Sequence, residues 1–151
     1  MMDLRELYQE LILDHNRNPR NRRHLEKASR SAMGYNPLCG DKVTIELLLD
    51  SQGSILDIAF EGSGCAISTA SASLMTEAVK GKTPTQIEAI FEKFHSEVTD
   101  QPCPKHQDVE LGKLVALIGV KKYPARVKCA TLAWHTLKAA LDQVGETVTT
   151  E

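Results

Sequence analysis

Alternating apolar and polar residues at 43–49 and again at 56–60 predict two half-buried β-strands. Residues 50–54, Asp-Ser-Gln-Gly-Ser, have the composition of a turn. We therefore expect the two strands to pair as an antiparallel hairpin. Because the outer ends of a hairpin lie together, Cys39, before the first strand, should meet Cys65, after the second.

Apolar residues at helical spacing predict helices on both sides of this hairpin. Gly81 stands where a C-terminal cap is expected, and Thr83 begins a capping box. One helix should stop near Gly119, and Tyr123 followed by a proline begins the last one. The polar tail after Gln143 is expected to fray. The predicted helices cover residues 3–14, 65–80, 83–98 and 111–118, and residues from 123 onward.

The segment 16–33 shows no hydrophobic period and carries six cationic side chains. It is predicted to be a solvated loop. The alternative is a basic surface that docks an acidic partner by electrostatic steering. The cations are Arg17, Arg20, Arg22, Arg23, Lys27 and Arg30.

A length of 151 residues fits a single domain spanning 1–151. The formal net charge of −2 argues against general nucleic-acid binding, which needs a basic excess. No apolar run approaches the roughly 20 residues of a membrane span, and no signal peptide opens the chain. A cytoplasmic protein without nucleic-acid or membrane partners is expected. In that reducing compartment its four cysteines are not expected to form structural disulfides.

The stretch Asn-Pro-Leu-Cys-Gly-Asp at 36–41 holds two potential metal ligands, Cys39 and Asp41, on either side of a glycine. In an extended backbone both side chains would point the same way, and the glycine would let the chain bend around one ion. Zinc accepts thiolate and carboxylate ligands and prefers four in a tetrahedron. Cys65 and Cys129 are the best candidates for the remaining two. The long spacings between these residues require a site assembled by tertiary folding.

Three thiolates and a carboxylate around one divalent cation leave net negative charge, which a nearby cation should offset. Arg126 lies three residues before Cys129 on the same side of the predicted helix. Its planar guanidinium can bond thiolate and carboxylate together, although an ordinary surface arginine is the alternative. Lys128 also flanks Cys129. If a partner supplied a ligand in place of Cys39, that thiolate could attack sulfur and become a persulfide.

The remaining cysteine and the histidines give weaker signals. Cys103 precedes Pro-Lys-His in a polar segment without a second ligand pair, so a surface thiol is expected. His15 follows the last turn of the first helix, where a cation would suit the helix dipole. His135 lies beside Trp134 on the last helix and is expected to be structural.

Four segments carry a family resemblance: LILDHNRNPRN at 11–21, NPLCGD at 36–41, GSGCAIS at 62–68 and YPARVKC at 123–129. With them the chain resembles the U-type iron–sulfur cluster assembly proteins, the family of IscU, SufU and NifU N-terminal domains. Within the family it is most similar to the SufU type. Scaffold-type members carry histidine before the third cysteine, where this chain has Lys128, and they look shorter between Cys65 and Cys129.

The resemblance implies an α+β fold, with a small antiparallel three-stranded sheet and about five helices packed against it. It also implies zinc bound by Cys39, Asp41, Cys65 and Cys129. SufU-like proteins accept sulfur on the residue matching Cys39 from a SufS-like, pyridoxal-phosphate-dependent cysteine desulfurase, and other iron–sulfur assembly proteins are further expected partners. Catalytic roles are accordingly expected for Cys39 and Arg126.

Two other functions stay open. The first alternative is a scaffold that assembles and transfers an iron–sulfur cluster, with iron or a cluster at the same ligands. The second is a domain in which zinc has only a structural role.

Overall fold

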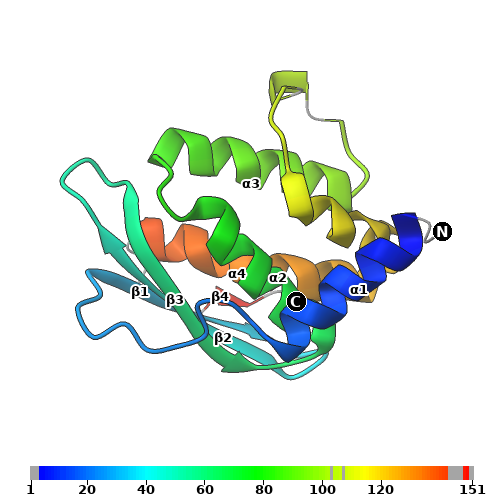
Figure 1. The fold of residues 1–151 in the computed structure, drawn as a ribbon, viewed down its shortest axis with the longest axis horizontal. Helices are drawn as coiled ribbons and strands as arrows, with labels where there is room; N and C mark the ends of the chain where they lie inside the picture. Colours follow the sequence, from blue (N-terminus) through cyan, green and yellow to red (C-terminus); the bar gives the residue numbers. More distant parts are fainter. Residues whose placement is uncertain (1–3, 103, 107, 143–147, 150–151) are drawn as a thin grey trace.

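The computed structural model describes residues 4–102, 104–106, 108–142 and 148–149. In this part of the chain, no helix has the length and apolar character needed to cross a membrane. A sheet forms one side of the molecule and helices cover its inner face (Figure 1). The elements are α1 (Leu4–Arg17), β1 (Arg30–Asn36), β2 (Asp41–Leu49), β3 (Ile55–Ser63), α2 (Ala66–Val79), α3 (Pro84–Val98), the 3₁₀ helices η1 (Pro104–His106) and η2 (Gly112–Lys122), α4 (Pro124–Leu141), and β4 (Val148–Thr149).

The predicted hairpin is confirmed as β2 paired antiparallel with β3. Its turn is closed by Asp50, whose carboxylate accepts hydrogen bonds from the backbone N–H groups of Gln52 and Ser54, both at 2.9 Å. Gly53 supplies the left-handed backbone conformation, with φ at +85°. Strand β1 pairs antiparallel with the other edge of β2 and completes the expected three-stranded sheet.

The loop prediction is wrong for the end of segment 16–33, because β1 begins at Arg30. The inward-facing residues of this strand are Ala32, Gly34 and Asn36, all buried, so its alternation involves small and polar side chains rather than large apolar ones. Gly34 is required by packing, since a Cβ there would collide with the Thr136 hydroxyl of α4.

The rest of that segment is held against β3 and α1 by its backbone and by two of its cations. Its backbone runs along β3, with the Phe60 N–H donating to Asn21 and the Arg23 N–H donating to Phe60. Arg20 pairs with Asp14 at 2.7 Å, and Arg23 pairs with Asp57 at 2.6 Å. Much of the positive charge is therefore matched within the molecule, which weakens the alternative of a basic docking surface.

A two-residue strand, β4, pairs in parallel with β1 at Gly34 and Tyr35, so the sheet order is β3-β2-β1-β4. The expectation of a frayed tail is wrong for Val148–Thr149, which caps the outer edge of β1.

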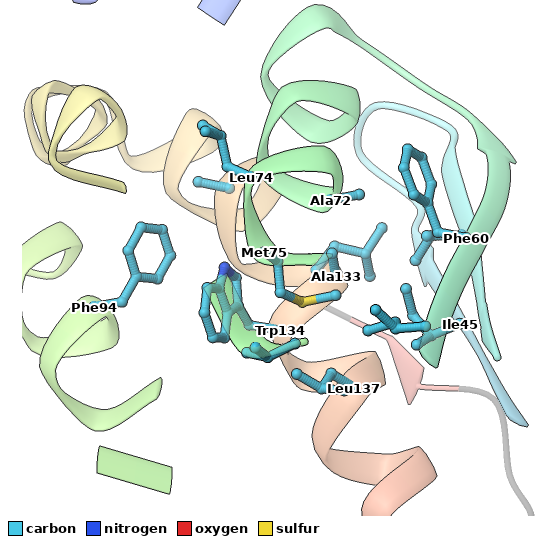
Figure 2. Close-up of a cluster of buried hydrophobic side chains, with 14 of the residues drawn as sticks. Ile45, Phe60, Ala72, Leu74, Met75, Phe94, Ala133, Trp134 and Leu137 are labelled. Atoms are coloured by element: carbon cyan, nitrogen blue, oxygen red, sulfur yellow. The ribbon is translucent and has the colours of Figure 1, made fainter. Parts of the chain in front are cut away.

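The core lies between the sheet and the α2–α4 helix pair (Figure 2). Ile45 and Phe60 project from the sheet towards Met75 of α2 and Leu137 of α4. Trp134 is fully buried on the far side of α4, where it stacks with Phe94 of α3 at a ring-centroid distance of 5.1 Å. Helices α1, α3 and η2 form a second layer over this pair.

The fourth predicted helix is a 3₁₀ helix and continues to Lys122 instead of stopping near Gly119. Gly119 does not adopt the left-handed conformation that would end a helix. The capping box at Thr83 and the proline start of α4 are confirmed.

Candidate metal centre

The stretch 36–41 forms the turn that joins β1 to β2. Asn36 and Asp41 are its last paired residues, and the Gly40 N–H donates to the Asn36 carbonyl at 2.9 Å. Gly40 has a φ of +72°, so the backbone turns here and is not extended. This turn places the Cys39 thiol at the surface while Asp41 is fully buried.

Three of the four predicted ligands come together at this turn. The Sγ atoms of Cys39 and Cys129 lie 3.5 Å apart. Ligand atoms of Cys39, Asp41 and Cys129 all lie within 4.8 Å of one another. Cys129 is fully buried in the second turn of α4, as predicted. Among the described residues, this is the sole group of three or more such side chains that could hold a metal ion.

Cys65 joins the cluster through Asp41. Its backbone N–H donates to Asp41 Oδ1 at 2.9 Å, and its Sγ lies 3.9 Å from Asp41 Oδ2. Cys65 is also the N-cap of α2, because its Sγ accepts the Ser68 N–H at 3.4 Å. The two hairpin ends lie together, since Lys42 pairs with Ser63 and Asp41 contacts Cys65. The Cys65 sulfur is not part of the group whose ligand atoms all lie within 4.8 Å, so the closer neighbour of Cys39 is Cys129.

Arg126 lies in the first turn of α4, three residues before Cys129. Its pKa is raised, first by the charge of Cys65 and then by a hydrogen bond with Cys129. Burial, together with hydrogen bonds to Cys39 and Asp41, raises the pKa of Cys129 well above its ordinary range. A metal ion bound here would supply the positive charge that favours the Cys129 thiolate.

The donor set fits a metal ion of intermediate to soft character. Two sulfur atoms and one carboxylate converge from the turn before β2, from β2 and from α4, and the Cys65 sulfur lies 3.9 Å from that carboxylate. Asp41 and Cys129 are fully buried. Thiolates and carboxylates bind zinc in tetrahedral sites, and thiolates also hold iron or iron–sulfur clusters. The geometry of these residues is compatible with zinc and with iron or an iron–sulfur cluster.

Two residues that support the cluster were not singled out from the sequence. Asn36 is fully buried, and its Nδ2 donates to Cys129 Sγ at 3.8 Å while its Oδ1 accepts the Leu38 N–H. Gly64 packs so closely on Asp41 that a Cβ would lie 2.6 Å from Oδ1. Both residues lie inside segments that carry the family resemblance, which is the one signal that could have identified them.

The other cysteine and histidine predictions have mixed outcomes. Cys103 lies outside the described residues. His15 is in the last turn of α1, but it is fully buried and its pKa is lowered, so the expectation of a cation there is wrong. His135 is half-buried against Phe91 and His95, in keeping with a structural role.

The family of the NifU-like N terminal domain matches residues 7–130. The chain belongs to this family. The NifU-like chain is 44% identical over 142 residues to the zinc-dependent sulfurtransferase SufU of Bacillus subtilis (strain 168), across 90% of each protein. It is 41% identical over 138 residues to the iron–sulfur cluster assembly scaffold protein IscU of Streptococcus pyogenes serotype M1, across 91% of this chain and 84% of that protein.

Solved structures agree with this assignment. The NifU-like chain matches a crystal structure of a hypothetical protein with a TM-score of 0.82 and 40% identity, over 92% of this chain and 99% of the other. It matches FiSufU of Fervidobacterium islandicum AW-1 with a TM-score of 0.80 and 34% identity, over the same shares. The chain is therefore a U-type iron–sulfur cluster assembly protein, with nearly equal similarity to a SufU and an IscU.

Proposed function

We propose that the chain is a zinc-dependent sulfurtransferase that accepts persulfide sulfur from a pyridoxal-phosphate-dependent cysteine desulfurase for iron–sulfur cluster assembly. The observation that carries this proposal is the asymmetry of the cluster. Cys39 is exposed on a glycine-containing turn, whereas Asp41 and Cys129 are fully buried and Cys65 caps a helix. One thiol can therefore meet a partner while the other ligands stay in place.

In this proposal Asp41, Cys65 and Cys129 form the fixed part of the site. Asp41 is oriented by the Cys65 N–H, and Cys129 is oriented by the Asn36 side chain. Zinc, when bound, would lower the pKa of the coordinating thiols so that they are thiolates at neutral pH.

Cys39 is the nucleophile. When a group of the partner replaces it in the cluster, its thiolate attacks the terminal sulfur of the desulfurase persulfide. A new sulfur–sulfur bond forms on Cys39, the sulfur–sulfur bond of the donor breaks, and the donor cysteine leaves as a thiolate. No external oxidant or reductant is needed, because the persulfide is passed from one cysteine to another.

Arg126 is proposed to stabilise the negative charge during this transfer. It lies in the first turn of α4, three residues before Cys129, and its pKa is raised by the charge of Cys65 and by a hydrogen bond with Cys129. It would favour the released Cys39 thiolate and the developing charge on the leaving sulfur.

The test is cysteine desulfurase turnover with and without the zinc-loaded protein. We expect stimulation by the wild type and by Cys103→Ser, and none by Cys39→Ala. Mass spectrometry after a single turnover should show an added sulfur on Cys39. A zinc-loaded wild type that neither speeds the desulfurase nor gains sulfur on Cys39 would remove the proposal.

The second candidate function, a cluster scaffold, is supported by the 41% identity to IscU and by thiolates that suit iron as well as zinc. The residue before Cys129 is Lys128, which cannot replace the histidine found there in scaffold-type members as a metal ligand at neutral pH. Anaerobic reconstitution that yields a stable, transferable cluster on the wild type would reverse the ranking.

A further inference from the structure

A groove of about 580 Å³ opens beside the metal centre, between α1, η2 and the start of α4. Figure 1 shows α1 lying alongside η2, and the two helices are in contact. Ile12, Ile67 and Val120 contribute apolar surface to the groove. Arg126 lines its wall three residues before Cys129, and Ile67 lines it two residues after Cys65, so the groove borders the segments that carry two of the candidate ligands.

The charge of the groove is of one sign. Arg5, Lys122 and Arg126 line it, and none of the described residues that line it is acidic. The whole chain has a net charge of −2, so this positive surface is a local feature and not a consequence of overall composition. A groove with apolar walls that is lined by positive charges concentrates the electrostatic field and favours an anionic ligand.

Exposed apolar side chains accompany these cations. Leu38 and Tyr123 are 65% and 62% exposed, the highest values among the large apolar side chains of the described part of the chain. Leu38 immediately precedes Cys39, and Tyr123 lines the groove. Apolar anchors combined with a charged rim are typical of a protein interface, and an open groove of this kind suits an extended segment of a partner.

We propose that this groove seats an acidic, partly apolar segment of the protein that donates the persulfide, and so brings the donor sulfur to Cys39. The inference rests on the proposed sulfur transfer and adds to it the docking site and the chemistry of the partner segment. Arg5 and Lys122 would bind the carboxylates of this segment, while Arg126 keeps the role proposed for it in sulfur transfer.

Gly119 allows a direct steric test. It lines the groove, its φ lies outside the left-handed region, and a Cβ there would meet no atom within 4 Å. Gly119→Phe should therefore fill the groove without disturbing the packing beneath it, and Gly119→Ala is the matched small control. Binding of a cysteine desulfurase from the same organism should weaken at least about tenfold with Gly119→Phe and less than about twofold with Gly119→Ala.

Charge reversal provides the second arm. The double variant Arg5→Glu, Lys122→Glu should weaken the same binding and reduce its dependence on salt, because rim charges act on association through screened attraction. The matched control is Arg17→Glu, Lys27→Glu, which makes the same charge change on exposed residues of segment 16–33. If the control weakens binding and the groove variant does not, the docking surface is segment 16–33 and the groove proposal is overturned.

Two further measurements separate docking from damage to the site. Zinc content and the reaction of Cys39 with cysteine persulfide should be unchanged in Gly119→Phe. If Gly119→Phe loses zinc or Cys39 reactivity to the same extent as it loses binding, the variant disturbs the cluster and the docking interpretation is overturned. Wild-type affinity for the desulfurase in both groove variants would also overturn it. A wild type that binds the desulfurase through the groove without accelerating it would instead remove the sulfurtransferase proposal and keep the docking site.

Discussion

At the residue scale, Asp41 is a buried carboxylate held in place by backbone. Its Oδ1 accepts the Cys65 N–H at 2.9 Å, and Gly64 leaves the space that the carboxylate occupies. Residues that orient metal ligands affect metal affinity nearly as much as the ligands do. Gly64 should therefore matter to the site although it has no side chain to offer.

Gly64→Ala is predicted to lower zinc affinity by about 10–100-fold, the range found when ligand-orienting partners are lost. The new Cβ would lie 2.6 Å from Asp41 Oδ1 and would push the carboxylate out of the cluster. The φ of Gly64 lies outside the left-handed region, so the backbone itself accepts alanine. Competition with a chromophoric chelator measures the change, and unaltered affinity would show that Asp41 does not bind the metal.

The candidate ligands could be selected from the sequence because thiols and carboxylates are residue types that bind metals. Cys39, Cys65 and Cys129 were found from residue type, and the hairpin explained how two of the segments meet. The supporting residues could not be found in that way. Asn36 donates a hydrogen bond to the thiol of Cys129, 93 positions away, and Gly64 leaves space for the Asp41 carboxylate because it has no side chain. Neither effect produces a recognisable pattern in the neighbouring sequence.

At the element scale, prediction succeeded where large apolar side chains set the period. The β2–β3 hairpin and α4 followed directly from such patterns. Strand β1 did not, because α4 packs so closely on it that its inward positions must be small, as at Gly34. The 3₁₀ form of η2 was also missed, since apolar spacing over a few turns does not separate it from an α-helix.

Helix α1 is fixed to α2 by a buried histidine. Ser73 Oγ accepts the Arg20 backbone N–H at 2.8 Å and forms a hydrogen bond of 2.7 Å with His15 Nδ1. The other ring nitrogen, Nε2, lies 3.5 Å from Glu77 Oε1. Burial, followed by the charge of Arg20, lowers the pKa of His15.

The attachment of α1 should weaken in mild acid. A histidine whose pKa is lower in the folded than in the unfolded state stabilises the fold fully above the unfolded value of about 6.5. That contribution is lost as the pH falls below 6.5 towards the folded pKa, at no more than about 1.4 kcal/mol per pH unit. His15→Asn, which cannot titrate, should show a shallower fall in the free energy of unfolding between pH 7 and pH 5.5.

Urea titrations of both proteins at matched zinc concentration measure this difference. His135, whose pKa is also lowered by burial, contributes with the same sign in both proteins and cancels in the comparison. Parallel pH dependences in wild type and variant would mean that His15 is not buried in its neutral form.

At the scale of the whole molecule, the candidate metal centre and the hydrophobic core are distinct. The candidate ligands come from the β1–β2 turn, the start of β2, the N-terminus of α2 and the second turn of α4. The core around Ile45, Trp134 and Leu137 is formed by the middle of the same elements. A metal ion would therefore cross-link segments that already pack together, so the fold should survive its loss with reduced stability.

Removal of zinc by a chelator is predicted to lower the melting temperature while a cooperative transition remains. A ligand at 100 times its Kd stabilises the fold by about 2.7 kcal/mol, which corresponds to roughly 5–10 °C for a chain of this size. Cys129→Ser should melt at the same temperature with or without zinc, because it lacks a buried ligand, whereas Cys103→Ser should keep the full difference. Circular dichroism with metal analysis measures both. If the protein instead unfolds after chelation, a purely structural zinc is favoured. The fold would then depend on intact zinc coordination, and Cys39 could not leave the metal without loss of the fold.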